Sequence, residues 1–191
     1  MSLNAIDDTL FIQMSFELYR YDISDDVTEQ ITYDARWLEL NGDSLYYCGK
    51  EGIIYKIGTK GDKPLAVSEL QTDGSGKEDE QSIYKYFVFI DDTMYYYKRR
   101  PDGLFRLKDG KSTLIDGDTN IDEFTLYAHD KKLYYITRDG EDGTLKMYDP
   151  QDGSISEISA VKNINGGSGV KIRNGYFYYF DKQGSLQRIK L

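Results

Sequence analysis

Apolar and polar residues follow one another in short blocks along the chain, and the same order of blocks recurs. An apolar residue followed by two aromatic residues occurs at Leu45–Tyr47, Met94–Tyr96, Leu133–Tyr135 and Phe177–Tyr179. A degenerate copy, Leu10–Ile12, lies near the N-terminus. The intervals between successive copies are 35, 49, 39 and 44 residues, with a mean near 42. A period of this length predicts a repeated structural unit.

A second signature follows each copy after 8 to 12 residues. Its five copies are Leu18–Tyr21, Ile54–Ile57, Leu104–Leu107, Leu145–Tyr148 and Leu186–Ile189. Four of the five have Lys or Arg at the third position. Asn41-Gly42 and Asn174-Gly175 are strong signals for hairpin turns ahead of the first signature. The sequence "AIDDTLF" near the N-terminus is mirrored by "FIDDTMY" 84 residues later, two periods away.

Each unit is therefore predicted to hold four short antiparallel strands. In the third unit we expect them at Phe87–Ile90, Met94–Lys98, Leu104–Lys108 and Ser112–Ile115. Four-stranded units of about 40–45 residues are typical of a β-propeller, in which each unit is one blade. The prediction is an all-β propeller of about five blades in a single domain, residues 5–191, with an open fragment of a larger propeller as the alternative. The units are expected at about 5–35, 36–82, 83–122, 123–165 and 166–191, the last without a fourth strand.

The run Tyr95–Tyr97 fits this architecture. A blade is covered on both faces by its neighbours, so its middle strands are expected to be apolar or aromatic without alternation. Tyrosine suits such a position because its ring is buried while its hydroxyl reaches an edge. We therefore interpret the tyrosines as packing between blades rather than as a binding platform.

Composition excludes several classes of function. The chain has 24 basic and 33 acidic residues, a net charge of −9, which disfavours nucleic acid as a partner. No apolar run approaches the roughly 18 residues needed to span a bilayer, so direct membrane insertion is not expected, and no signal peptide is visible. Cys48 is the only cysteine, which excludes an intrachain disulfide and a cysteine-based zinc site.

The titratable residues do not form a recognisable catalytic set. His129 is the only histidine and is expected in a surface turn. Asp7, Asp8, Asp91 and Asp92 are expected in turns between the first two strands of their units, where Asp satisfies turn geometry. We therefore predict no catalytic residue, no metal site and no cofactor.

The segment "DGDTNIDEF" has the sharpest local pattern. Asp116, Asp118, Asn120 and Asp122 recur at every second position, as the oxygen ligands of calcium loops do. Ile121 stands where such a loop requires glycine, and Tyr127 where it requires an acid. Calcium binding is left open, and a solvated connection between two blades is the favoured interpretation.

The candidate binding residues are expected on the loops of one propeller face. They are Trp37, Tyr84, Arg99 and Arg100, and the long polar insertion Gln71–Ser82 is expected on the same face. Arg99 and Arg100 do not recur in the other units, so they are what this blade adds to a common scaffold.

The pattern "LYYxxxxGxIYKI" resembles bacterial tyrosine-rich propeller repeats of unknown function, which look like distant relatives of the YWTD propellers of lipoprotein-receptor type. The matching residues are Leu45, Tyr46, Tyr47, Gly52, Ile54, Tyr55, Lys56 and Ile57, with equivalents in the other units. The YWTD tetrapeptide itself is absent. The resemblance implies a propeller fold, an extracytoplasmic or cell-surface location and a binding role.

The function predicted from the sequence is a non-enzymatic binding or scaffold domain that presents one loop face to a protein, peptide or glycan. Two alternatives stay open. One is a propeller enzyme of lyase or glycosidase type with a site at the central axis. The other is a structural segment of a larger surface protein.

Overall fold

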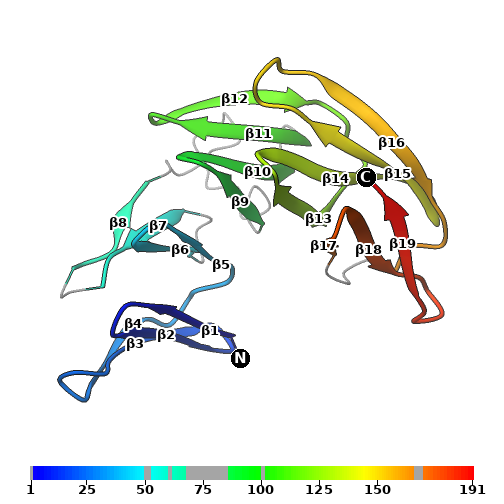
Figure 1. Ribbon diagram of the computed structural model, residues 1–191. Helices are drawn as coiled ribbons and strands as arrows, with labels where there is room; N and C mark the ends of the chain where they lie inside the picture. Colours follow the sequence, from blue (N-terminus) through cyan, green and yellow to red (C-terminus); the bar gives the residue numbers. More distant parts are fainter. Residues whose placement is uncertain (1, 50–52, 60–61, 68–85, 100–101, 166–169) are drawn as a thin grey trace. The chain divides into compact units, whose positions relative to one another are not determined.

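The computed structural model describes residues 2–49, 53–59, 62–67, 86–99, 102–165 and 170–191, without the side chains of residues 2, 99 and 123. In these ranges the regular secondary structure consists of β-strands that form five antiparallel sheets (Figure 1). The chain divides into two compact units, unit 1 being Met1–Lys85 and unit 2 Tyr86–Leu191. In the described ranges no helix is long and apolar enough to cross a membrane.

Unit 1 contains two four-stranded sheets, each a simple meander. The strands of the first sheet are β1 (Ser2–Ile6), β2 (Thr9–Met14), β3 (Glu17–Asp22) and β4 (Val27–Thr32). The strands of the second sheet are β5 (Leu38–Asn41), β6 (Ser44–Cys48), β7 (Ile54–Ile57) and β8 (Leu65–Ala66).

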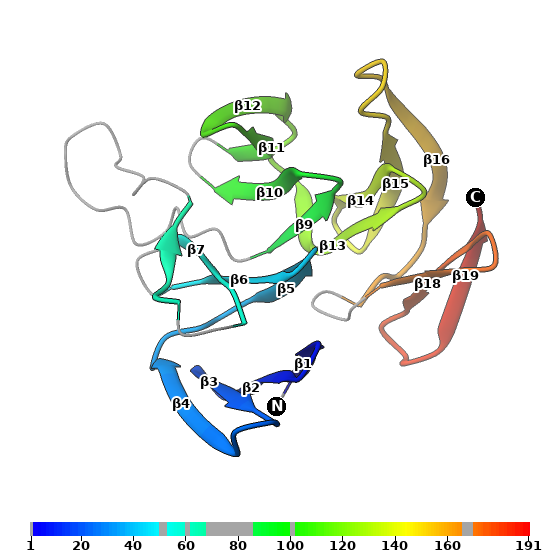
Figure 2. The ribbon, with the colours of Figure 1, turned by 60° about the vertical axis from the view of Figure 1, so that its left-hand side comes forward.

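Unit 2 contains three sheets with the same meander order (Figure 2). The third sheet consists of β9 (Phe87–Ile90), β10 (Thr93–Arg99), β11 (Asp102–Lys108) and β12 (Lys111–Asp116). The fourth consists of β13 (Ile121–His129), β14 (Lys132–Asp139), β15 (Asp142–Tyr148) and β16 (Ile155–Val161). The fifth consists of β17 (Lys171–Arg173), β18 (Tyr176–Phe180) and β19 (Leu186–Lys190).

The sequence repeat predicted these sheets well. All four strands of the third sheet occur where they were expected, with ends that differ by at most two residues. Two units begin slightly earlier than predicted: β1 begins at Ser2 and β13 at Ile121, against expected starts at about 5 and 123. The fifth sheet has three strands in the described ranges, as predicted. The meander sheets are consistent with propeller blades, whereas the single domain and the closed ring stay predictions.

The tight turns depend on residues that tolerate positive φ. Asp7, Asp91, Asp130 and Asn174 begin the turn between the first two strands of four sheets, with φ between 46° and 53°. Asp and Asn enter this left-handed region at lower cost than other side chains. The interpretation of the turn aspartates as structural is thereby supported. His129, in contrast, is the last residue of β13 rather than part of the turn, so that placement was wrong.

Successive sheets within each unit pack face to face. In unit 1 the core joins Phe11 and Leu18 of the first sheet to Leu45 and Tyr47 of the second. In unit 2 one core joins the third and fourth sheets and another joins the fourth and fifth. The first strands β9, β13 and β17 also contact one another in that order. Face-to-face packing of this kind is what blades require.

Neighbouring tyrosines of a run lie on opposite faces of their sheet. Tyr95 and Tyr97 pack into the core between the third and fourth sheets. Tyr96 stacks on Phe105, and its hydroxyl is hydrogen-bonded to Ser112 Oγ. In the fourth sheet, Tyr135 and Tyr134 likewise join different cores. Tyr95, Tyr97, Tyr134 and Tyr135 therefore pack between sheets, as predicted.

Candidate functional site

Trp37 is the one predicted binding residue whose side chain the structure describes. It is half-buried and lies in unit 1, between β4 and β5. The backbone of Arg99 pairs with Asp102 at the end of β10 in unit 2. Tyr84, Arg100 and the insertion Gln71–Ser82 lie outside the described residues. Trp37 is therefore the starting point for the site.

The segment Ala35–Trp37 is held on both sides by backbone hydrogen bonds. The amide of Ala35 donates to the carbonyl of Phe16 over 2.7 Å, and Gln13 Nε2 donates to the carbonyl of Ala35 over 2.6 Å. On the other side, the amide of Arg36 donates to the carbonyl of Cys48 over 2.9 Å. Ala35 itself is fully buried. The connection between the two sheets is therefore fixed to both, which gives Arg36 and Trp37 a defined backbone position.

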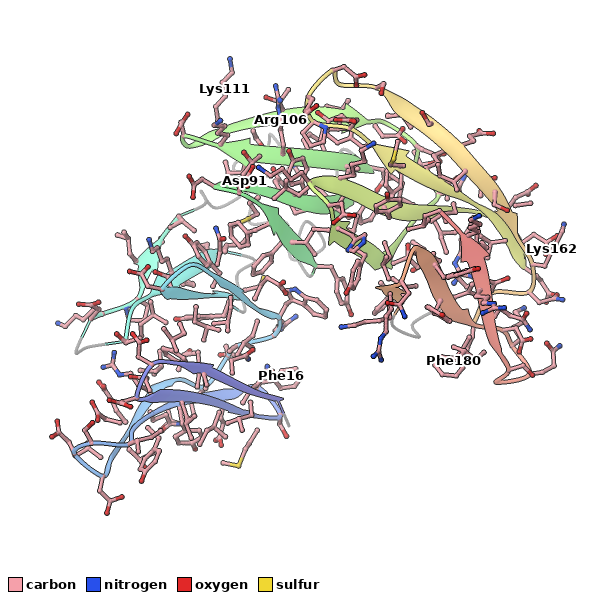
Figure 3. All side chains as sticks on the ribbon, in the orientation of Figure 1. Phe16, Asp91, Arg106, Lys111, Lys162 and Phe180 are labelled. Carbon is pink, nitrogen blue, oxygen red and sulfur yellow. The ribbon has the colours of Figure 1, made fainter. Side chains whose placement is uncertain are left out.

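Arg36 lies beside an exposed aromatic side chain. Its guanidinium carbon is 6.0 Å from the ring centroid of Phe16, at the outer limit of a cation–π contact. Phe16 is 57% exposed and Met14 46% exposed, and Figure 3 shows Phe16 at the edge of unit 1. Within the described ranges the buried Nε of Arg36 has no hydrogen-bond partner. We call Phe16, Arg36 and Trp37 the Arg36 surface.

Arg36 and Phe16 were not among the binding residues predicted from the sequence. Arg36 directly precedes Trp37, so its proximity was readable from the chain. Phe16 is 20 residues earlier, in the turn between β2 and β3, and nothing in the repeat pattern links it to Arg36. The hydrogen bond between Ala35 and Phe16 creates that link, which is a tertiary contact.

The acidic segment after β12 is occupied by a cation of the chain itself. Lys146 Nζ lies 3.1 Å from Asp118 Oδ2 and 3.6 Å from Asp116 Oδ2. Tyr135 Oη donates to Asp116 Oδ2 over 2.7 Å. Partial burial raises the pKa of Asp118, but hydrogen bonds from the Asn120 amide and from Lys146 outweigh it, so the net pKa is lowered. These contacts satisfy the carboxylates without a metal ion.

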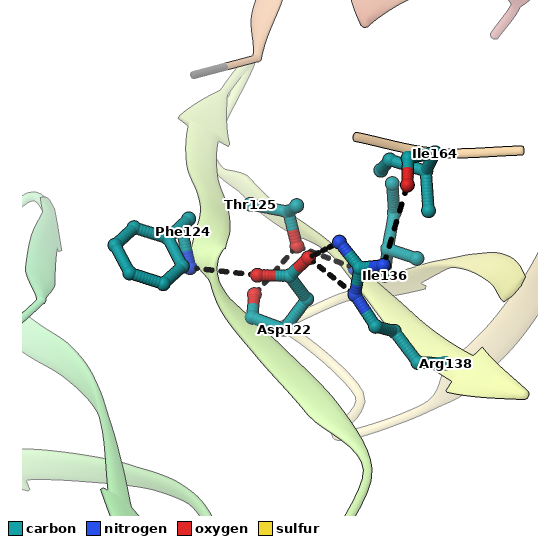
Figure 4. A network of polar contacts seen from close by, with 6 residues as sticks. All are labelled: Asp122, Phe124, Thr125, Ile136, Arg138 and Ile164. Atoms are coloured by element: carbon teal, nitrogen blue, oxygen red, sulfur yellow. Dashed lines mark hydrogen bonds and ion pairs between the residues drawn. The ribbon is translucent and has the colours of Figure 1, made fainter. Parts of the chain in front are cut away.

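Asp122 is separated from that group and forms a network of its own (Figure 4). Its Oδ2 accepts hydrogen bonds from Nε and Nη2 of Arg138, the first over 2.7 Å. Its Oδ1 accepts from the Phe124 amide, while Thr125 Oγ1 donates to the Asp122 carbonyl and accepts from the Ile136 amide. The expectation of a solvated connection was wrong here, because Asp122 is a buried residue of β13.

The Asp122 network lies at an irregularity in the β13–β14 ladder and supplies hydrogen bonds there. The register shifts between Asp122 and Tyr127, so the intervening residues lose regular partners on β14. The hydroxyl of Thr125 replaces one of the lost ladder contacts by accepting from the Ile136 amide over 2.9 Å. Phe124, in the shifted stretch, is 39% exposed and packs on Tyr86 with ring centroids 4.5 Å apart.

Each unit also has a polar pocket beside an Asp-Asp-Thr turn. The pocket in unit 1 has a volume of about 650 Å³ and is lined by Asp7, Asp8, Thr9 and Arg20, among others. The pocket in unit 2 has a volume of about 420 Å³ and is lined by the corresponding Asp91, Asp92, Thr93 and Arg106. The repeated "IDDT" sequence therefore marks two related pockets, which the repeat alone did not predict.

The remaining candidate groups have simple roles. His129 Nε2 lies 3.4 Å from Asp130 Oδ2, next to it in the chain. Within the described ranges, no group of three or more His, Cys, Asp or Glu side chains is arranged to hold a metal ion.

Comparison with known proteins shows a likeness of fold. No protein-family model matches the chain, and no curated protein matches its sequence. A chain in the crystal structure of a nidogen/laminin complex is similar, with a TM-score of 0.65 and 10% identity over 95% of this chain and 73% of that one. The extracellular domain of a proposed one-component system from B. thetaiotaomicron has a TM-score of 0.65 and 20% identity; the match covers 98% of this chain and 27% of that one.

A computationally designed protein, Ika8, is also similar, with a TM-score of 0.56 and 10% identity over 99% of this chain and 70% of the other. At these identities the likeness concerns the fold alone. It supports a propeller-like relationship for the five sheets.

Proposed function

We propose that this chain is a non-enzymatic binding module that holds a segment of a protein partner on the Arg36 surface. The observation that carries the proposal is the buried Nε of Arg36, which has no hydrogen-bond partner in the described ranges. An unsatisfied buried donor costs about 1–3 kcal/mol, and such groups in native structures call for an explanation. Because this atom is shielded from solvent, we include in the proposal that the Arg36 side chain turns outward when the partner binds and there meets the missing acceptor.

The neighbourhood of Arg36 indicates the chemistry of that partner. The guanidinium is cationic and lies over the exposed ring of Phe16. Arginine and aromatic side chains are the residue types that contribute most to protein interfaces. A carboxylate beside an apolar side chain would satisfy both groups, since the carboxylate accepts from Arg36 and the apolar group covers Phe16. We therefore expect the partner segment to contain an acidic residue next to an apolar one.

Two further points support a binding role. The backbone hydrogen bonds on both sides of Ala35–Trp37 fix the surface in advance, which lowers the entropy lost on binding. The similar chain from the nidogen/laminin complex belongs to a protein that was crystallised with a protein partner. Closure of the sheets into one propeller ring, an extracytoplasmic location and the absence of catalysis are part of this proposal.

A random peptide library displayed on phage tests the proposal. We expect selection on the wild-type chain to enrich peptides with an acidic residue beside an apolar one. Phe16→Ala, Arg36→Gln and Trp37→Ala should each weaken the selected peptides by about tenfold or more. Leu65→Ala is the matched control, because Leu65 is an apolar residue of β8 that is 64% exposed. Peptides that bind the three variants as tightly as the wild type would overturn the proposal.

A further inference from the structure

Arg20 and Arg106 occupy the same position in two sheets. Arg20 on β3 is paired with Phe11 on one side and with Glu29 on the other. Arg106 on β11 is paired with Tyr95 on one side and with Thr113 on the other. Phe11 and Tyr95 are equivalent because each is the second residue after an Asp-Asp-Thr turn. The difference between the two arginines therefore lies in the residue opposite, Glu29 against Thr113.

This difference decides whether the guanidinium has an acidic partner on the neighbouring strand. Arg20, only 5% exposed, forms an ion pair with Glu29, and its Nη1 donates to the carbonyl of Gly58 over 3.4 Å. Thr113 offers no charge to Arg106, and within the described ranges Arg106 forms no hydrogen bond or ion pair. The other cations of the second signature all have partners: Lys56 contacts the ring of Tyr46, Arg188 the ring of Tyr176, and Lys146 the two aspartates.

The unpaired Arg106 borders the pocket of unit 2. That pocket, about 420 Å³ in volume, is lined by residues of β9, β10 and β11 and of the turns that follow β9, β11, β13 and β15. Thr93, Tyr95 and Gln151 contribute further hydrogen-bond donors to it. A half-buried arginine among such donors is suited to the two oxygen atoms of a carboxylate.

The charges around the pocket indicate that the ligand also carries a cation. Its lining holds three positive groups, Arg106, Lys108 and Lys131, and three negative ones, Asp91, Asp92 and Asp109. One of these pairs is internal but loose, since Lys131 Nζ lies 3.6 Å from Asp91 Oδ1 and both side chains are well exposed. A ligand with a net negative charge would be repelled by the three aspartates. A molecule with one carboxylate and one ammonium group matches both sets.

We propose that the pocket of unit 2 binds a small zwitterion of the amino-acid or short-peptide class, with its carboxylate on Arg106 and its ammonium group on the aspartates of the rim. The site is independent of the Arg36 surface, because it lies in unit 2 and shares no residue with that surface. In the pocket of unit 1 the equivalent arginine, Arg20, is already paired with the cross-strand carboxylate of Glu29.

Binding of glycylglycine, followed by NMR shifts of the backbone amides, tests the site. Glycinamide lacks the carboxylate and N-acetylglycine lacks the ammonium group, so each is expected to bind at least about tenfold more weakly. Arg106→Gln should weaken glycylglycine binding to a similar degree. Lys111→Gln makes the same change of charge on an exposed lysine that does not line the pocket, and it should leave binding unchanged (Figure 3).

A second variant reproduces the pairing found in unit 1. Thr113→Glu places a carboxylate opposite Arg106, as Glu29 stands opposite Arg20, and should abolish binding while the fold is retained. A circular dichroism melt checks the fold of both pocket variants. Glycylglycine binding that survives Arg106→Gln or Thr113→Glu in a folded protein would overturn the proposal, and so would N-acetylglycine or inorganic phosphate binding as tightly as glycylglycine.

Discussion

Lys146 Nζ lies 3.1 Å from Asp118 Oδ2, so the ammonium group of Lys146 pairs with a carboxylate of the connection that precedes its sheet. Lys146 is a residue of β15, and Asp118 lies between β12 and β13. The ion pair therefore links the segment that follows the third sheet to the fourth sheet. Its side chains are 15% and 27% exposed, which leaves it partly screened from water.

The first prediction concerns calcium. Because Lys146 neutralises Asp116 and Asp118, calcium would have to displace an ammonium group to reach them. We expect no rise in the thermal unfolding midpoint of the wild-type chain at about 1 mM calcium, the range in which extracellular calcium modules bind. Lys146→Gln should lower the free energy of unfolding by about 1–2 kcal/mol, since it leaves two acidic groups side by side. A saturable rise of the wild-type midpoint with calcium would contradict this expectation.

The second prediction concerns the network around Asp122. Asp122→Asn removes the charge that pairs with Arg138 and weakens the hydrogen bonds that close the irregular ladder. We expect the free energy of unfolding to fall by about 2 kcal/mol, measured by urea denaturation. Asp109→Asn is the control, because Asp109 is an exposed turn residue with a φ of 51°, which Asn also tolerates. Equal effects of the two substitutions would show that the buried pair adds no stability.

Much of the fold was predictable because strand and turn signals are local. Consecutive apolar residues such as Tyr95–Tyr97 and turn residues such as Asp91 specify a strand and its end without knowledge of distant residues. The repeat then adds independent copies of each signal. The same signals carry no information on ring closure, because closure depends on contacts between sheets that are far apart in sequence.

The sites were harder to predict because they depend on cross-strand register. Thr113 faces Arg106 and Glu29 faces Arg20 in the regular stretch next to each turn, and the register shifts only beyond these pairs, between Leu104 and Phe105 and between Leu18 and Tyr19. Each pairing therefore follows from the position and length of the adjacent turn, which must be known to the residue before a partner can be assigned. The link between Phe16 and Arg36 is likewise a tertiary contact.

The third prediction concerns a close approach of backbone at Gly143. A Cβ atom there would lie 2.6 Å from the carbonyl oxygen of Thr137 and 2.8 Å from Cγ2 of Ile136. Because the nearest atom belongs to the backbone, it cannot turn aside as a flexible side chain could. Gly143→Ala should therefore lower the free energy of unfolding by about 1–3 kcal/mol in urea denaturation.

The matched control for that prediction is Gly140→Asn. Gly140 has a φ of 62°, and a Cβ atom there would meet nothing within 4 Å. Asn tolerates this conformation, so the loss should stay below about 0.5 kcal/mol. A larger loss at Gly140 than at Gly143 would show that strand contacts at Gly143 are looser than the structure indicates.

The fourth prediction concerns the pH dependence that Glu39 adds to stability. Glu39 lies on β5 opposite Tyr46, and burial raises its pKa to about 7 from an ordinary 4.5. The folded chain then binds the proton more tightly than the unfolded chain does. Below about pH 4.5 Glu39 is protonated in both states and does not change the free energy of unfolding. As the pH rises from there toward 7, Glu39 lowers that free energy progressively.

Glu39→Gln should abolish that loss, since glutamine stays neutral at every pH. We expect the variant and the wild type to be equally stable at pH 4, and the variant to be more stable at pH 8 by on the order of 1 kcal/mol. The measurement is the difference between their free energies of unfolding across this range. Taking the difference cancels the contributions of the other carboxylates, such as Asp142, whose pKa is lowered by hydrogen bonds from Lys162 and the Asn163 amide. A difference that is already present at pH 4, or that declines as the pH rises, would show that Glu39 titrates normally and acts through its packing.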